Sequence, residues 1–342
     1  MKLKTLSLVS KFRHQLSYVT TGFIGLIVLG AQPVLAATYS AITPFAGVGT
    51  LTAVLGVNNH GWMTGDVLNA DGTTTGFLRS QTGAYTLFNS SDFNTFGRGI
   101  NNANVVTGYT TDSTGNLLLG HEFKRNPDGA LTFLTNPTDG SLLHGIAQGI
   151  NGSGQIVGDY RFVAGGHNFR HGYLLDGASF TDLSQSADFR IKQNARGITD
   201  SGAIVGWRLD NNTGVTQGFV DVGGVFTYIT DPSIDNANTT YLEAINNKGL
   251  ASGEWTDTAG NAHPFLYNTL TRAFTELSPP DGANFDAFGI NDRGQVVLTN
   301  ANGDGRNFLY SPGGVPEPET WVTMVLGLAG VGCAARRRPV AV

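Results

Sequence analysis

The chain has 342 residues, of which 40% are hydrophobic and 14% charged, and its formal net charge is −5. This apolar composition excludes an intrinsically disordered chain, and the acidic balance argues against a nucleic-acid-binding protein. A single cysteine excludes internal disulfides and any metal site that needs two cysteines.

Residues 1–36 have the organisation of a secretory signal peptide. Four basic residues lie near the start, and an apolar run follows over 23–29. Val34 and Ala36 then supply small side chains at the −3 and −1 positions, which predicts cleavage between Ala36 and Ala37. A retained membrane anchor is the alternative, but the apolar run is shorter than the ~20 residues that span a bilayer. We therefore expect export through the secretion machinery.

One unit recurs six times between the two ends of the chain. Its anchor is Gly-Ile-Asn at 99–101, 149–151 and 289–291, with variants at 56–58, 197–199 and 244–246. Four residues after each anchor aliphatic comes a glycine or, once, Asn104, and these residue types tolerate positive φ. The anchor asparagine can cap the same turn through its side chain. Each anchor is therefore predicted to be a hairpin turn of type I with a G1 bulge.

Three further strand patterns follow each turn. They are an apolar run that ends in glycine, an aromatic–aliphatic pair, and a short strand of the form aromatic or leucine, threonine, any residue, apolar. Four strands in about 46 residues are typical of a propeller blade. We therefore predict an all-β, six-bladed β-propeller over residues 37–313, with a β-solenoid as the alternative.

The number of strand patterns in the sequence predicts how the ring of blades closes. The sixth unit stops at Ser311 without its last strand, whereas Tyr39–Ile42 match the missing pattern. An N-terminal strand that completes the last blade would close the ring and remove its open edge. A solenoid would have no need of such a strand.

The C-terminal segment, residues 314–342, contains three parts in order. Pro316, Glu317 and Pro318 come first, an apolar stretch follows over 321–335, and a basic cluster comes last: Arg336, Arg337, Arg338. This tail resembles the PEP-CTERM protein-sorting signal. The resemblance implies recognition by an exosortase, a membrane-bound cysteine transpeptidase, in a Gram-negative-type bacterium that makes exopolysaccharide. The arginines would mark the cytoplasmic side of a short transmembrane helix, which contacts the membrane at least transiently.

The repeats resemble the extracellular HAF family, named for a His-Ala-Phe triplet on the third strand. The triplets here begin at His121, His171 and His263, and the other units carry different residues: Thr75, Gln217, Arg306. The resemblance implies an exported, propeller-like module without a defined reaction. Because the three histidines occupy one repeat position, we expect them on separate blades, in packing or hydrogen bonds, and not around a metal.

The sequence contains no catalytic motif that we would assign, so no catalytic residue and no cofactor are predicted. Asp159 and Glu254 could act as acid and base in a central funnel, but they share one repeat position, which favours a structural role. Asn300, Asn302 and Asp304 have the spacing of calcium ligands. Hairpin turns select the same residue types for backbone reasons, so we prefer the turn to calcium.

Removal of both ends leaves 14 basic against 26 acidic residues, a net charge near −12, which should repel nucleic acid. The sequence favours a noncatalytic propeller at the cell surface or in the extracellular matrix that binds exopolysaccharide or an envelope partner. Four repeated aromatics, expected to be exposed, are the candidate sugar-stacking residues, although inter-blade packing would also explain them: Tyr109, Tyr160, Trp207, Trp255. A polysaccharide hydrolase or lyase and a purely structural biofilm-matrix protein are the alternatives.

Overall fold

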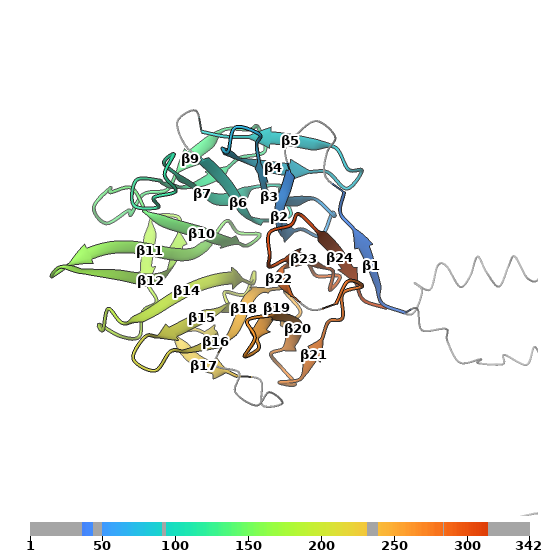
Figure 1. The fold of residues 1–342 in the computed structure, drawn as a ribbon. Coiled ribbons are helices and arrows are strands. Elements are labelled where there is room, and N and C mark those ends of the chain that lie inside the picture. The colour runs from blue at the N-terminus through green and yellow to red at the C-terminus, as the bar shows by residue number, and fades with distance from the viewer. Residues whose placement is uncertain (1–35, 44–49, 91–93, 231–238, 283, 314–342) are drawn as a thin grey trace, which may run out of the picture. The chain divides into compact units, whose positions relative to one another are not determined.

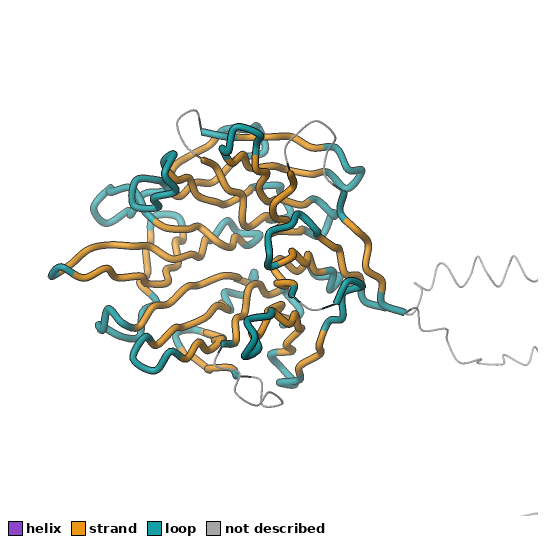
Figure 2. Tube along the Cα trace, viewed as in Figure 1, coloured by secondary structure: helices purple, strands orange, loops and turns teal. Residues whose placement is uncertain are grey.

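Six four-stranded antiparallel sheets lie around a common axis as the blades of a β-propeller (Figure 1). The computed structural model describes residues 36–43, 50–90, 94–230, 239–282 and 284–313. In these ranges the chain consists of strands, turns and loops without a helix (Figure 2). Accordingly, this part of the chain contains no helical segment with the length and hydrophobicity of a membrane span.

The first three blades each contain four consecutive strands, from the innermost to the outermost. Blade 1 contains β2 (Thr50–Val57), β3 (Met63–Leu68), β4 (Thr74–Arg79) and β5 (Tyr85–Phe88). Blade 2 contains β6 (Asn94–Ile100), β7 (Val106–Thr111), β8 (Glu122–Arg125) and β9 (Leu131–Phe133). Blade 3 contains β10 (Gly145–Ile150), β11 (Ile156–Ala164), β12 (His167–Asp176) and β13 (Ser179–Asp182).

Blades 4 and 5 repeat this order, and blade 6 takes its outer strand from the other end of the chain. Blade 4 contains β14 (Ile191–Ile198), β15 (Ile204–Asp210), β16 (Val215–Val222) and β17 (Val225–Ile229). Blade 5 contains β18 (Thr240–Ile245), β19 (Leu250–Thr256), β20 (Ala262–Asn268) and β21 (Phe274–Glu276). Blade 6 contains β22 (Phe285–Ile290), β23 (Val296–Asn300), β24 (Asn307–Ser311) and β1 (Thr38–Ala41).

The predicted closure is confirmed. Strand β1 pairs antiparallel with β24, and Tyr39 lies opposite Tyr310. The two rings are 5.3 Å apart, and the Tyr39 hydroxyl accepts a hydrogen bond from the Ser278 backbone N–H of blade 5. Ile42 is buried beside Val297 of blade 6 and Val54 of blade 1. Strand β1 and the residue that follows it thus join the last blade to the first.

The predicted turns are confirmed as well. In blade 1 the Gly61 N–H donates to the Asn58 carbonyl at 3.1 Å, and the Asn58 N–H donates to the Trp62 carbonyl at 3.0 Å. All six predicted left-handed positions have positive φ: Gly61, Asn104, Gly154, Gly202, Gly249, Gly294. Asparagine is the residue that tolerates this conformation best after glycine, which explains Asn104 at φ 60°. Local backbone chemistry therefore places one hairpin at the same point of every blade.

Each blade is centred on an aromatic residue of the third strand. In blade 3 the fully buried Tyr173 lies opposite Gly158 of the second strand. A Cβ at Gly158 would approach the Ile146 carbonyl oxygen to 2.3 Å and the Tyr173 ring to 2.8 Å, so only glycine fits under the ring. Blade 6 departs from this pairing, because Leu298 stands opposite Phe308. Blades 1, 2, 4 and 5 have the same glycine–aromatic pair as blade 3: Gly65–Phe77, Gly108–Phe123, Gly206–Phe219, Gly253–Phe265.

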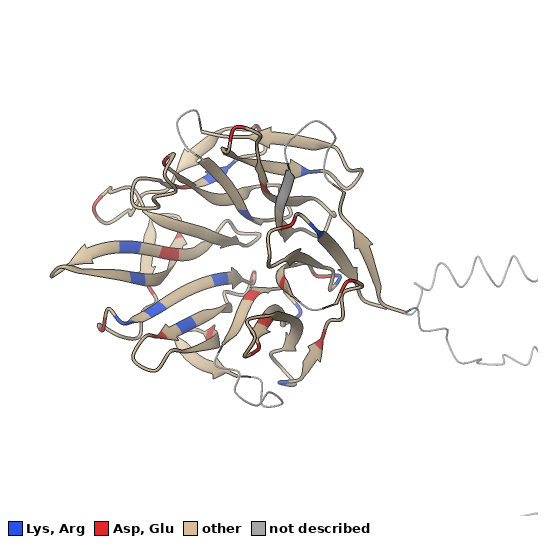
Figure 3. Ribbon diagram, viewed as in Figure 1, with Lys and Arg blue, Asp and Glu red and all other residues tan. Residues whose placement is uncertain are grey.

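Several predictions concern the chain ends. Ala36 and Ala37, the predicted cleavage site, are exposed and precede β1 without regular structure. The predicted sorting residues and the apolar stretch 321–335 lie outside the described residues. In the described part, acidic and basic residues are scattered along the strands and loops of the blades (Figure 3).

Candidate functional site

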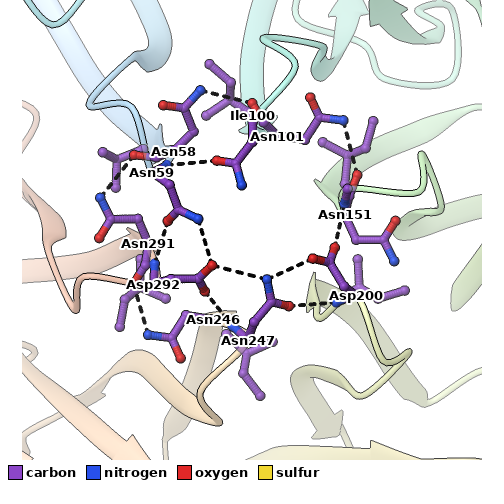
Figure 4. A pocket seen from close by; sticks show the side chains of 17 residues that line it. Asn58, Asn59, Ile100, Asn101, Asn151, Asp200, Asn246, Asn247, Asn291 and Asp292 are labelled. Carbon is purple, nitrogen blue, oxygen red and sulfur yellow. Dashed lines mark hydrogen bonds between the residues drawn. The ribbon is translucent and has the colours of Figure 1, made fainter.

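A ring of anchor asparagines closes the axis at the turn end of the propeller (Figure 4). Each asparagine accepts backbone N–H bonds from its own turn through Oδ1, as Asn58 does from His60 and Trp62. Its Nδ2 then donates to the carbonyl of the corresponding residue in the next blade. These inter-blade bonds are 2.9–3.1 Å long: Asn58 to Asn101, Asn101 to Asn151, Asn151 to Thr199, Asn246 to Asn291, Asn291 to Asn58.

Five of the six blade interfaces therefore have the same buried hydrogen bond, including the interface between the last and first blades. The exception is the interface between blades 4 and 5, where Thr199 replaces asparagine. The Thr199 hydroxyl accepts from the Ala203 N–H within its own turn at 3.0 Å. Since threonine has no amide donor, it cannot reproduce the bond to the Asn246 carbonyl.

A second ring lies one residue further along each turn. The Asp200 N–H donates to Asn247 Oδ1, the Asn247 N–H to Asp292 Oδ1, and the Asp292 N–H to Asn59 Oδ1, at 2.7–2.8 Å. The ring is interrupted at Gly152, which has no side chain to offer Asn102. Sequence reasoning predicted the caps within each turn but missed both sets of bonds between blades.

The aliphatic anchor residues form a layer behind these rings: Val57, Ile100, Ile150, Ile198, Ile245, Ile290. They line two small cavities, of about 80 Å³ on the asparagine side and about 90 Å³ on the other side. Both volumes lie well below the 300–1,000 Å³ typical of small-molecule sites. The axis can therefore hold a few water molecules at each level but no sugar residue.

The second axial cavity is lined by polar residues from four consecutive blades. These are Arg98, Gln148, Arg196 and Glu243, each one residue before the anchor glycine or alanine. Blade 1 has Leu55 at this position. The anchor residues beside this position are nearly the same in every blade, whereas the residue at this position changes from blade to blade. The polar layer is therefore not part of the structural repeat. Comparison of the six units position by position would have found it in the sequence.

Arg196 connects two other members of this polar layer, Gln148 and Glu243. Its Nη1 donates to Gln148 Oε1 at 3.1 Å and lies 3.2 Å from Glu243 Oε2. Arg98 Nη2 donates to the Tyr109 hydroxyl at 3.1 Å. Arg98 Nε, Arg196 Nε and Gln148 Nε2 are buried without a partner among the described residues. Such atoms mark positions for ordered water in the axial cavity.

Three carboxyl groups belong to the same region. Burial raises the pKa of Glu243, although Arg196 opposes the shift. Burial and the nearby Glu243 raise the pKa of Glu254 well above its usual range. The same two causes raise the pKa of Asp286 to about 7. Because like charges in a buried site disfavour ionisation, at least part of this group stays protonated near neutral pH.

We expect Asp286→Asn to stabilise the propeller, and to do so more strongly at pH 8 than at pH 5. The folded-state pKa of Asp286 lies above the unfolded value of 3.8, so its stabilising contribution is present below pH 4 and lost as the pH rises through 7. This shift corresponds to a gain on the order of 4 kcal/mol at pH 8, of which less than half is present at pH 5, where the unfolded carboxyl is already mostly ionised. Urea unfolding of both proteins at pH 5 and 8 measures this difference. Equal gains at the two pH values would contradict the assignment.

The four predicted aromatic residues take part in packing. Tyr109 and Trp207 are buried, at 8% and 7% exposure, so the prediction that they are exposed is wrong. Tyr109 stacks on Phe96 with ring centres 4.6 Å apart. Trp207 lies under the Arg170 guanidinium at 4.8 Å. The charged neighbours that cover these rings come from other strands and blades, which the repeat pattern does not reveal.

The other two aromatics are partly buried. Trp255 stacks on His263 at 3.9 Å with nearly parallel planes. The Tyr160 hydroxyl donates to Asp182 Oδ2 at 2.9 Å, and the same carboxylate lies 2.8 Å from His171 Nδ1. Burial and Asp182 raise the pKa of Tyr160 above its ordinary value. These aromatics are therefore held by their own blades.

The histidines at the HAF position lie on separate blades, as predicted. His171 and His263 contact residues of their own blades, and His121 packs against Phe133 of blade 2 and His144 at the start of blade 3. Among the described residues no group of three or more His, Cys, Asp or Glu side chains has a metal-binding arrangement.

The calcium-like loop is organised as a turn. The Asn302 N–H donates to Asn300 Oδ1 at 2.9 Å. Asp304 accepts from the Arg306 Nε at 2.7 Å and from the Arg306 N–H at 3.0 Å. A calcium ion would have to displace this arginine, so the geometry favours the turn over a cation site.

Asp159 and Glu254, the two carboxylates considered for acid–base catalysis, lie on different blades. Asp159 is fully buried on β11 of blade 3, where Arg170 Nε donates to it at 2.7 Å. Glu254 lies on β19 of blade 5, opposite Tyr241. The two carboxylates belong to different sheets, and the first is neutralised by arginine.

Comparison with known proteins assigns no function to this propeller. No family model matches the sequence, and no curated protein matches it. A proposed gluconolactonase is 11% identical, with 82% of this chain and 95% of that chain covered and a TM-score of 0.49. A mutant Aleuria aurantia lectin in complex with Fucalpha1-6GlcNAc is 10% identical, with coverage of 84% and 100% and a TM-score of 0.48. A streptogramin B lyase is 12% identical, with coverage of 80% and 97% and a TM-score of 0.42. Such distant likenesses carry no information on ligand or activity.

Proposed function

We propose that the chain is an exported, exosortase-sorted β-propeller that binds a glycan or an envelope partner at the cell surface or in the extracellular matrix. The observation that carries the sorting part is the ordered tail: Pro316-Glu317-Pro318, the apolar stretch 321–335, and Arg336-Arg337-Arg338. In this proposal the tail tethers the chain to the membrane for sorting, and the propeller is the exported part.

The arrangement of the carboxylates supports binding over hydrolysis. Glu243 belongs to an axial cavity of about 90 Å³, too small for a sugar residue and an attacking water together. Asp159 is paired with Arg170 and Arg161. Binding without turnover is therefore the better explanation of the polar groups that the propeller presents.

Truncation of residues 315–342 tests the sorting part. We expect the full-length chain in the surface or matrix fraction and the truncated chain in the periplasm, because the truncated chain keeps its signal peptide but lacks the tether. Fractionation followed by immunoblotting measures this, and an Arg190→Ala variant with an intact tail is the control. The sorting proposal fails if the truncated and full-length chains have the same distribution.

The hydrolase or lyase alternative predicts a different result from the same purified chain. Incubation with the host's own exopolysaccharide would release reducing ends or unsaturated sugars. Such turnover would replace the binding function.

A further inference from the structure

A cavity of about 390 Å³ lies between blades 4 and 5 on the turn side of the propeller. Blade 4 contributes residues of the β14–β15 turn, β16 and β17, including Ser201 and Val222. Blade 5 contributes its anchor turn and the β20–β21 turn, including Lys248, Leu270 and Arg272. The volume falls within the range of small-molecule sites, unlike that of either axial cavity.

The cavity coincides with the one blade interface that lacks the inter-blade asparagine bond. Thr199, which replaces that asparagine, and Asn247 of the second ring both line it. The second ring still connects the two blades here, because Asp200 and Asn247 exchange hydrogen bonds of 2.8 and 2.9 Å. The second ring thus connects blades 4 and 5, and the cavity lies beside these bonds.

The charge of the lining is opposite to that of the protein. Among the described residues that line it, Lys248 and Arg272 are the charged ones, and none of these lining residues is a carboxylate. Both side chains are exposed, and neither forms a salt bridge among the described residues. The Asp292 carboxyl lies outside the lining. Burial raises its pKa, but hydrogen bonds from Asn59 and Asn247, together with the charge of Lys248, hold the pKa below its usual value. In a body with a net charge near −12, this local positive charge favours an anionic ligand.

Arg272 occupies a strained backbone position. Its φ is +61°, whereas the corresponding turns of blades 1 and 2 have Gly83 at +90° and Gly129 at +96°. The left-handed region is unfavourable for arginine, because its Cβ crowds the backbone, and it is open to glycine. Strain of this kind is typical of functional positions. The same turn exposes Leu270, which is 81% accessible at the cavity.

We propose that this cavity binds a carboxylated sugar residue, such as a uronic acid unit of an anionic polysaccharide. Arg272 and Lys248 bind the carboxylate, and the hydroxyl groups of Ser201 and Thr269 with the Asn247 amide bind the sugar hydroxyls. Val222 and Leu270 pack against the C–H face of the ring. The inference deepens the proposed binding function and rests on it, but it does not depend on sorting by the tail.

Isothermal titration calorimetry with the purified full-length chain and trigalacturonate tests the inference. We expect saturable binding of trigalacturonate, with at least tenfold weaker binding of the neutral trigalactose. Arg272→Gly should weaken binding at least tenfold while the thermal midpoint stays the same or rises, since glycine relieves the positive φ. Arg190→Ala, which removes an exposed charge elsewhere on blade 4, should bind like the parent chain.

Thr199→Asn is the second variant, because it supplies the missing inter-blade donor. We expect a higher thermal midpoint and at least threefold weaker trigalacturonate binding, since the new bond would close the interface. Unchanged affinity in Arg272→Gly would overturn the inference, as would equal affinity for trigalactose. Equal affinity for hexaglutamate would assign the cavity to acidic peptides and also overturn it.

Titration with the host exopolysaccharide beside trigalacturonate distinguishes a failure of this inference from a failure of the proposed function. Binding of the host exopolysaccharide without binding of trigalacturonate, or binding that Arg272→Gly leaves intact, would overturn the cavity assignment and leave the proposed function standing. Trigalacturonate binding that is lost in Arg272→Gly supports the cavity assignment even if fractionation disproves sorting.

Discussion

A chain that lacks residues 37–43 behind an intact signal peptide is expected to unfold at least 10 °C below the full-length chain. The truncation removes β1, which forms four residue pairs with β24, and exposes the open edge of blade 6. It also removes Ile42, which is buried between blades 6 and 1. Burial of an isoleucine contributes about 2–5 kcal/mol, and each hydrogen bond about 0.5–1.5 kcal/mol. The sum for Ile42 and four hydrogen bonds is about 4–11 kcal/mol, and at roughly 2–3 °C per kcal/mol the middle of this range corresponds to more than 10 °C.

Differential scanning calorimetry measures this effect, and two point variants separate its sources. Ile42→Ala should lose about 2–5 kcal/mol through the core alone. Ser40→Ala changes an exposed residue of β1 and should stay within about 0.5 kcal/mol of the parent chain. An unchanged thermal midpoint in the truncated chain would show that β1 does not close the propeller.

Asn291→Ala should lower the free energy of unfolding by about 2–4 kcal/mol. Asn291 Nδ2 donates to the Asn58 carbonyl at 3.0 Å, which joins the last blade to the first. Its Oδ1 accepts the Arg293 and Gln295 N–H groups of its own turn. The side chain is 3% exposed, so its removal leaves these buried groups unsatisfied. Urea unfolding measures the change.

Asn291→Thr is the matched control, because Thr199 shows that threonine can cap this turn without reaching the next blade. It should retain the turn and lose only the inter-blade bond, about 1–2 kcal/mol. A threonine variant as stable as the parent chain would mean that the asparagine ring does not contribute to closure.

The fold was predictable because its signals are local. Positive φ at Gly61 or Asn104 and capping by Asn58 depend on residues within one turn, and six copies of that turn fix the number of blades. The β1–β24 pairing is non-local, yet it was predictable because the sixth unit lacked one strand and residues 39–42 supplied the matching pattern.

The site was less predictable. Tyr109 and Trp207 were expected to be exposed, but Arg98 of the adjacent strand covers the first and Arg170 of the neighbouring blade covers the second. The polar layer around Arg196 joins three blades, and each of its members is a single residue in an otherwise repeated segment. Side chains that meet across blades are far apart in sequence, so no periodicity reveals their contacts.

The sequence by itself determined the repeat, the turns, the number of blades and the strand that closes them, because each depends on backbone chemistry within a few residues or on a count of units. Only the tertiary structure decided which side chains meet around the axis, and where one blade interface is left open. Those contacts depend on how neighbouring sheets pack. In the sequence, Thr199 is only a variant of the anchor asparagine. The structure shows that this replacement removes a hydrogen bond to Asn246 of the next blade.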